Sequence, residues 1–216
     1  MARCPKAIAA IAALGLLCAN HDPVVTLDSG SVRGEALGEG GAFRGIPFAA
    51  PPTGDLRWRD AVPVAKWQGI RDARNFGPAC PQKKEEGRGS LPQSEDCLSI
   101  NVITPDLKAN KLPVLVSIHG GAYAFGSNRY VTDQGLSPLL RKGVVLVAPN
   151  YRVGRFGFFA HPALTAEAGR GTGNFWLSDQ ILALDWVRRN IARFGGDPQN
   201  VTILGCSAGG SSVNAL

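Results

Sequence analysis

The stretch Val201-Thr-Ile-Leu-Gly-Cys-Ser-Ala-Gly-Gly210 decides the fold, because it joins a predicted strand to a serine flanked by glycines. Its first four residues are apolar or β-branched, which predicts a short buried strand. Ser207 then lies between Gly205 and Gly209 in a Gly-x-Ser-x-Gly pattern. A nucleophilic serine needs a strained turn that projects its Oγ, and only residues without bulk fit where the strand and the next helix pass close together. The layout is typical of a nucleophile elbow.

The bare Gly-x-Ser-x-Gly pattern is not decisive, because the chain has 27 glycines among its 216 residues. A glycine-rich turn that carries an idle serine is the alternative interpretation. The context favours a nucleophile, since a strand precedes the pattern and the small residues 208–212 follow it, as expected for the start of a closely packed helix. We therefore interpret Ser207 as the candidate nucleophile.

A second predicted strand, residues 112–118, ends in His119-Gly-Gly-Ala-Tyr123. Glycines directly after a strand let backbone N–H groups turn toward a bound oxygen, and a tetrahedral intermediate needs such donors where its negative charge develops. The N–H groups of Gly120, Gly121 and Ala208 are the predicted oxyanion hole. A plain turn of glycines is the alternative.

None of the three histidines is predicted to be the catalytic base. His119 precedes the oxyanion glycines and is expected to pack and hydrogen-bond in support of that loop. His21 and His161 have no recognisable motif around them, and a lone histidine is more often structural or solvated than catalytic.

Several ordered blocks of sequence resemble the type-B carboxylesterases, the α/β-hydrolase family that also contains the cholinesterases. The resemblance runs from about Val24 to Leu216. The blocks that carry it are residues 43–52, 56–58, 94–102, 150–158 and 179–198, followed by the elbow. The resemblance implies hydrolysis of carboxylic esters through an acyl-enzyme, with a small-molecule ester as the partner and no metal or organic cofactor.

The resemblance also implies an α/β fold: the N-terminal, incomplete part of an α/β-hydrolase fold, with a mostly parallel central sheet and an antiparallel N-terminal hairpin. The residue patterns give matching elements. The predicted strands are residues 98–103, 114–118, 144–148 and 201–204, with a hairpin at 24–27 and 31–34. A helix is predicted over residues 178–194, with Ile181, Leu184, Val187, Ile191 and Phe194 on its buried face. No repeat or linker divides the chain.

Carried over to this sequence, the resemblance places a disulfide at Cys80 and Cys97 and a buried structural ion pair at Arg57 and Glu95. Ser207 falls on the nucleophile. The triad order in such proteins is serine, acid, histidine. The acid and the histidine are therefore expected beyond residue 216, and residues 1–216 alone are expected to turn over little substrate, since a serine without a base is a poor nucleophile.

The sequence departs from the family pattern at several positions. Cys206 stands where the family usually has glutamate, Ala122 where it has a third oxyanion glycine, and Trp176 where it mostly has glycine. The segment between Cys80 and Cys97 has no aromatic residue. Cholinesterases place a tryptophan there to bind a quaternary ammonium by cation–π attraction, so its lack argues against a cholinesterase.

The first residues form a basic start followed by an apolar run over residues 7–17, which is too short to span a membrane. We predict a signal peptide at 1–19 and one domain at 20–216, exported to the periplasm or outside the cell. No other run is long enough to span a bilayer. The net charge is +6 with scattered Lys and Arg, which argues against a nucleic-acid partner. No Cys/His spacing suggests zinc.

Two other functions stay open. A non-catalytic binding or adhesion module could carry the same fold, although Ser207 and the intact oxyanion glycines argue against it. A genuine short product without activity of its own is the second alternative, and the residues do not decide it.

Overall fold

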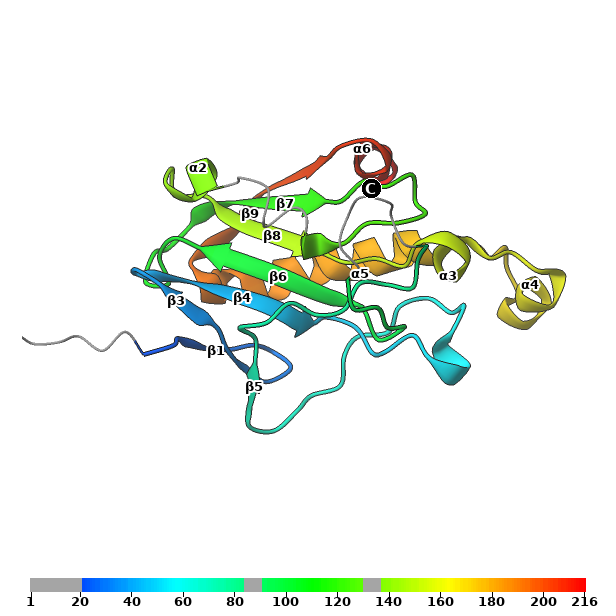
Figure 1. Ribbon diagram of the computed structural model, residues 1–216, viewed down its shortest axis with the longest axis horizontal. Helices are drawn as coiled ribbons and strands as arrows, with labels where there is room; N and C mark the ends of the chain where they lie inside the picture. The colour runs from blue at the N-terminus through cyan, green and yellow to red at the C-terminus, as the bar shows by residue number, and fades with distance from the viewer. Residues whose placement is uncertain (1–20, 84–90, 130–136) are drawn as a thin grey trace, which may run out of the picture.

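The computed structural model describes residues 21–83, 91–129 and 137–216. The predicted signal peptide at 1–19 lies outside the described residues. Within the described part of the chain, the fold is built around one large sheet, with a smaller sheet beneath it (Figure 1).

The large sheet has six strands in the order β3-β4-β6-β8-β7-β9. Their bounds are β3 (Glu35–Leu37), β4 (Gly40–Pro47), β6 (Ser99–Thr104), β7 (Leu112–Ile118), β8 (Val145–Pro149) and β9 (Gly196–Gly205). The predicted strands at 98–103, 114–118, 144–148 and 201–204 are all present as β6, β7, β8 and β9. The β3–β4 hairpin was not predicted, because its glycines give it little strand propensity.

The predicted α/β architecture is present, but the central sheet, which was expected to be mostly parallel, is mixed in the described residues. Strands β3, β4, β6 and β8 pair antiparallel, whereas β8, β7 and β9 pair parallel. Parallel neighbours need long crossover connections, and the segments between β7 and β8 and between β8 and β9 provide them. The parallel part of the sheet is therefore the part that carries the candidate catalytic loops.

The predicted N-terminal hairpin forms from β1 (Val24–Thr26) and β2 (Ser31–Arg33). It belongs to the separate small sheet, in which β5 (Ile70–Asp72) pairs parallel to β2. The helices are α2 (Ser137–Leu140), α3 (Gly154–Phe158), α4 (Pro162–Ala168), α5 (Phe175–Asn190) and α6 (Ala208–Ala215), with 3-10 turns η1 (Gly54–Leu56) and η2 (Ile191–Phe194). In Figure 1, α4 projects away from the rest of the molecule.

Side chains of the large sheet alternate between two apolar cores, as the period of a strand requires. One core lies between the sheet and α5, where Val116, Val147 and Trp186 are buried. The other core is smaller and lies under α2, where Leu146 packs against Leu139 and Leu140. The long helix α5 therefore covers the more extensive core (Figure 1).

The predicted helix is present as α5 followed by η2, but its buried face was predicted only in part. Val187, Ile191 and Phe194 are buried, whereas Ile181 is 55% exposed. The buried face instead includes the polar residues Asp179, Gln180 and Asn190. Each of the three has a buried hydrogen-bond partner, so hydrophobicity alone assigns the face wrongly.

The prediction that residues 201–204 form a buried strand is wrong in one respect. Strand β9 is the last strand of the sheet in the described chain, and Leu204 is 47% exposed. Thr202 and Leu204 point to the face away from α5, where α2 reaches only part of the sheet. Val201 and Ile203 point the other way and pack against the α5 core.

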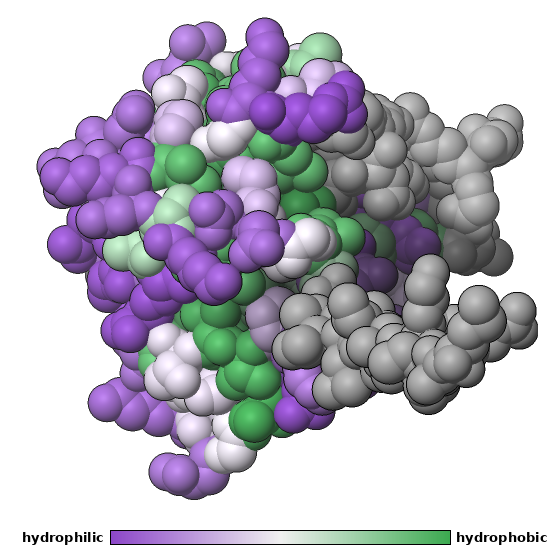
Figure 2. All heavy atoms as spheres, turned by 90° about the vertical axis from the view of Figure 1, so that its left-hand side faces the viewer, coloured by the Kyte–Doolittle hydropathy of each residue, from purple (hydrophilic) through white to green (hydrophobic). Residues whose placement is uncertain are grey.

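Cys80 and Cys97 form a disulfide that closes a loop with a sequence separation of 17. Both cysteines are buried beside the α5 core. In the described residues, no helix is long and apolar enough to cross a membrane. Figure 2 shows hydrophilic side chains over much of one end of the molecule, with apolar residues in a band across it.

We expect the Cys80→Ser/Cys97→Ser double substitution to lower the free energy of unfolding by about 3 kcal/mol, because it frees a loop of this length in the unfolded chain. Urea denaturation monitored by circular dichroism measures the loss. Cys206→Ser, which removes the exposed free thiol, is the matched control and should leave the midpoint unchanged. An unchanged midpoint in the double variant would contradict the prediction.

Candidate active site

Ser207 occupies a strained turn between β9 and α6. Its backbone has φ 56° and ψ −126°, a conformation that non-glycine residues rarely adopt. It is the residue just before the first turn of α6, and its side chain is exposed. The turn therefore presents the Ser207 hydroxyl at the end of the sheet, as an elbow requires.

The positions two residues before and two residues after Ser207 require glycine, because neighbouring backbone atoms lie where a side chain would be. A Cβ added to Gly205 would lie 2.2 Å from the carbonyl carbon and oxygen of Gly209. A Cβ added to Gly209 would lie 2.2 Å from the carbonyl oxygen of Ile118 at the end of β7. Any side chain at either position would push α6 away from the strands, so the pattern Gly-x-Ser-x-Gly is a packing requirement here.

The loop after β7 lies directly against the serine turn. A Cβ added to Gly120 would lie 2.7 Å from the carbonyl oxygen of Cys206 and 3.4 Å from the Cβ of Ser207. The structure thus brings Gly120, Ser207 and Ala208 together at the ends of β7 and β9 (Figure 1). Gly121 follows at φ 116°, which is open to glycine but not to residues with a side chain.

Three backbone N–H groups at this junction are available as donors. Within the described part of the chain, no hydrogen bond uses the N–H of Gly120, Gly121 or Ala208. Ala208 begins α6, where the first N–H groups have no partner inside the helix. An anionic oxygen placed beside Ser207 is the kind of group that such donors bind.

The oxyanion loop, which we define as residues 119–126, folds into a tight turn. Ala122 at φ 51° and Tyr123 at φ 58° are consecutive left-handed residues. The N–H groups of Ala124 and Phe125 both donate to the carbonyl oxygen of Gly121, at 2.9 and 3.1 Å. The N–H of Gly154 donates to the carbonyl of Tyr123 at 2.6 Å, which ties the loop to α3.

His119 is buried at the start of this loop. Its ring stacks on the ring of Tyr151, with centroids 4.2 Å apart and planes inclined by 14°. Its Nδ1 lies 2.9 Å from the carbonyl oxygen of Gly120. Burial lowers the pKa of His119 to about 4, against a smaller rise from that hydrogen bond, so the ring is neutral near pH 7. Because a carbonyl only accepts, Nδ1 carries the proton.

The other described histidines do not reach the serine. His161 accepts a hydrogen bond from the N–H of Ala163 at the start of α4. Among the described residues, no imidazole or carboxylate hydrogen-bonds to the Ser207 hydroxyl. The described residues therefore offer a candidate nucleophile and candidate oxyanion donors, and none of them places a base in contact with Ser207.

Two ion pairs bear on the prediction of a buried structural pair, and only one of them was predicted. Arg57 and Glu95 pair through two hydrogen bonds of 2.5 and 2.7 Å, but their side chains are 38% and 26% exposed, so this pair is not the buried one expected. The buried pair is Arg152 with Asp179, at 2.6 Å, which joins the end of β8 to α5.

Trp176 is nearly buried and fills space beside the oxyanion loop. Its ring stacks on Phe158 at 5.3 Å and contacts Tyr123 at 4.9 Å, so three segments meet in one aromatic cluster. Cys206 is an exposed free thiol next to Ser207. No carboxylate is therefore present at this position beside the serine.

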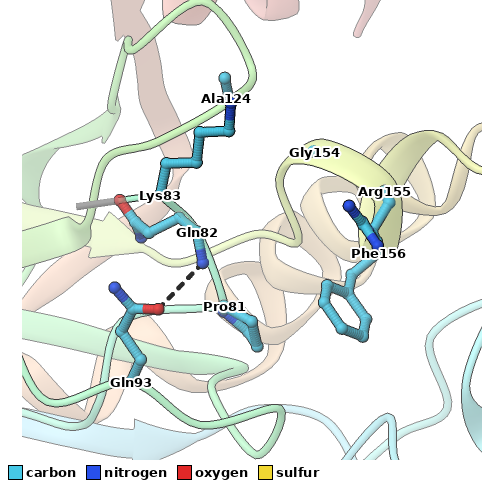
Figure 3. A pocket seen from close by; sticks show the side chains of 8 residues that line it. All are labelled: Pro81, Gln82, Lys83, Gln93, Ala124, Gly154, Arg155 and Phe156. Atoms are coloured by element: carbon cyan, nitrogen blue, oxygen red, sulfur yellow. Dashed lines mark hydrogen bonds between the residues drawn. The ribbon is translucent and has the colours of Figure 1, made fainter. Parts of the chain in front are cut away.

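A hollow of about 480 Å³ lies between the disulfide-closed loop and α3. Figure 3 shows Gln82 and Gln93 on one side of it, joined by a hydrogen bond, and Arg155 and Phe156 on the other. The Gln82 side chain also accepts from the N–H of Gly126 at 2.7 Å and donates to its carbonyl at 2.9 Å. The disulfide-closed loop thus holds the far end of the oxyanion loop.

The chain is similar in sequence to known esterases. The sequence matches the model of the carboxylesterase family over residues 21–216. It is 46% identical over 192 residues to the fumonisin B1 esterase of Sphingopyxis macrogoltabida, covering 87% of this chain and 35% of that protein. It is 42% identical over 197 residues to the para-nitrobenzyl esterase of Bacillus subtilis, covering 89% of this chain and 40% of that protein.

A solved structure of a PNB esterase superposes with a TM-score of 0.82 at 40% sequence identity. The match covers 90% of this chain and 40% of the PNB esterase chain. The chain thus spans 35 to 40% of the length of these relatives.

The buried His119 predicts a pH dependence of stability. Its pKa is about 4 in the folded protein and 6.5 in the reference state, so only the unfolded chain takes up a proton between these values. Stability should therefore fall as the pH drops from about 6.5 to 4 and level off below, by about 3 kcal/mol in total. Urea denaturation of wild type and His119→Gln across this range measures the difference. A difference that does not change with pH would contradict the prediction.

Proposed function

Because this chain belongs to the carboxylesterase family, we propose that the protein hydrolyses carboxylic esters through an acyl-enzyme formed on Ser207. The observation that carries the proposal is the contact between the oxyanion loop and the serine turn, where a Cβ on Gly120 would lie 3.4 Å from the Cβ of Ser207. Donors and nucleophile within this reach of one another are what acyl transfer requires.

In the proposed reaction, the Ser207 Oγ attacks the ester carbonyl while a base accepts its proton. The carbonyl oxygen becomes an oxyanion and is held by the N–H groups of Gly120, Gly121 and Ala208. Collapse of this intermediate expels the alkoxide, which takes up the proton from the base. Water then attacks the acyl-enzyme by the same route and releases the acid. We propose that a histidine and an acidic residue in the remainder of the complete protein supply the base and its support.

The substrate class follows from the chemistry and from the relatives. The matched proteins are named as esterases of fumonisin B1 and of para-nitrobenzyl esters, and we propose a small-molecule carboxylic ester here as well. The described residues supply the reacting groups. The preference for particular acyl and alcohol groups of the substrate depends on pocket residues outside the described part of the chain. A non-catalytic binding module remains the alternative that the experiment below separates.

We further propose that the protein is exported with removal of residues 1–19. The basic start and the apolar run at 7–17 support this, and the Cys80–Cys97 disulfide fits an oxidising compartment. The intact mass and N-terminal sequence of the mature protein test the proposal. An N-terminus at Met1 in protein taken from its native compartment would contradict it.

In the complete protein, we expect a fluorophosphonate probe to label Ser207 and Ser207→Ala to abolish the labelling. Hydrolysis of para-nitrophenyl acetate should fall on the order of 10⁶-fold in kcat, because the acyl-enzyme can no longer form. Mass spectrometry of the labelled peptide identifies the modified residue.

Two matched controls accompany this experiment. Ser211→Ala removes an exposed hydroxyl of α6 one turn after the nucleophile, and Cys206→Ala removes the neighbouring thiol. Both variants should keep the label. A folded wild-type protein that takes up no label and hydrolyses no ester would favour the binding-module alternative.

A further inference from the structure

We propose that Tyr151 is a positioning residue that, together with His119, orients the two peptide groups whose N–H bonds form the oxyanion hole. This inference rests on the proposed function and adds a residue that no sequence motif connects with the reaction. Its basis is the pattern of hydrogen bonds on the carbonyl side of those same two peptides.

The first peptide joins His119 to Gly120. Its carbonyl oxygen, that of His119, accepts a hydrogen bond of 2.7 Å from the Tyr151 hydroxyl, and its N–H is the one that Gly120 offers to an oxyanion. A peptide group is planar and trans, so its C=O and N–H point in opposite directions. The bond from Tyr151 therefore fixes the direction in which the Gly120 N–H points.

The second peptide joins Gly120 to Gly121. Its carbonyl oxygen, that of Gly120, lies 2.9 Å from Nδ1 of His119, which carries the ring proton. By the same planarity, this bond fixes the direction of the Gly121 N–H. The N–H groups of Gly120 and Gly121 are thus both oriented by a hydrogen bond to the carbonyl of the same peptide. Tyr151 donates one of these bonds and His119 the other.

Tyr151 is well placed to hold this arrangement. It is the second residue after β8, its side chain is fully buried, and its ring lies against the His119 ring with centroids 4.2 Å apart. Burial raises the pKa of Tyr151, so the hydroxyl keeps its proton and donates. Gly126 packs closely against the His119 ring, and a side chain there would displace the ring, because a Cβ would lie 2.3 Å from Nδ1.

The bonds also strengthen the donors. A carbonyl that accepts a hydrogen bond polarises its peptide, and chains of hydrogen bonds reinforce one another in a low-dielectric interior. An oxyanion at Gly120 would complete the chain from the Tyr151 hydroxyl through the peptide to the substrate oxygen. Tyr151 and His119 should therefore stabilise the charged tetrahedral intermediate more than the neutral bound ester.

The test is Tyr151→Phe in the complete protein, which keeps the stacked ring and removes the hydroxyl. Losing an entire oxyanion donor costs about 10²- to 10³-fold in kcat, and a donor that is only misdirected should cost less. We expect kcat to fall about 10-fold with KM unchanged. The inhibition constant of a trifluoromethyl ketone, whose adduct with Ser207 carries an oxyanion, should rise by the same factor.

Thr104→Val is the matched control. It also removes one buried hydroxyl that donates to a backbone carbonyl, that of Phe194 at 2.8 Å, but it lies at the opposite end of β6 from the site. The control should lower the melting temperature to a similar extent and leave kcat and the ketone affinity unchanged. A Tyr151→Phe variant that behaves like Thr104→Val would overturn the proposal.

A second variant covers the case in which Tyr151→Phe does not fold. His119→Phe keeps a ring against Tyr151 and removes the donor to Gly120, so the same split between kcat and KM is expected. Normal kcat and normal ketone affinity in folded His119→Phe would also overturn the proposal. A wild-type protein that hydrolyses no ester and takes up no phosphonate would refute the proposed function itself, whereas an active wild type with an unaffected Tyr151→Phe refutes only the positioning role.

Discussion

The close approach between the end of β7 and the turn from β9 into α6 is the constraint on which the rest of the site depends. Backbone atoms of Gly120, Gly205 and Gly209 occupy the space that side chains would need. This contact places α6 against the strands, and Ser207 between them has a positive φ and an exposed side chain. The candidate nucleophile and the candidate donors therefore lie close together because glycines without side chains separate them. Other interactions stabilise that arrangement.

Three consecutive residues after β8 do much of this holding. Asn150 accepts from the N–H of Asn128 and donates to the carbonyls of Pro78 and Cys97, so it joins the disulfide-closed loop to the segment after the oxyanion loop. Tyr151 fixes the start of the oxyanion loop, and Arg152 pairs with Asp179 in α5. A short segment thus connects separate parts of the fold through buried polar contacts, which are costly to break singly.

Features that depend on a local residue pattern could be predicted from the sequence. Features that depend on hydrogen-bond partners distant in the chain could not. The strands and the serine turn were found because apolar runs and glycines mark them within a few residues. The buried face of α5 was misassigned at Ile181, since Asp179 and Gln180 are buried only through partners distant in the chain. Strand β9 was expected to be buried because a run of apolar residues does not tell an edge strand from a central one. The role of Tyr151 needed the observed hydrogen bond to His119.

The edge position of strand β9 affects how residues 21–216 would behave in solution as a separate polypeptide. In the described chain it pairs with β7 along one edge only, and Leu204 is half exposed on its face. An open edge with apolar side chains is a template for adding another strand. Two copies of this polypeptide could pair edge to edge through β9, so its behaviour at high concentration would reflect self-association as well as folding.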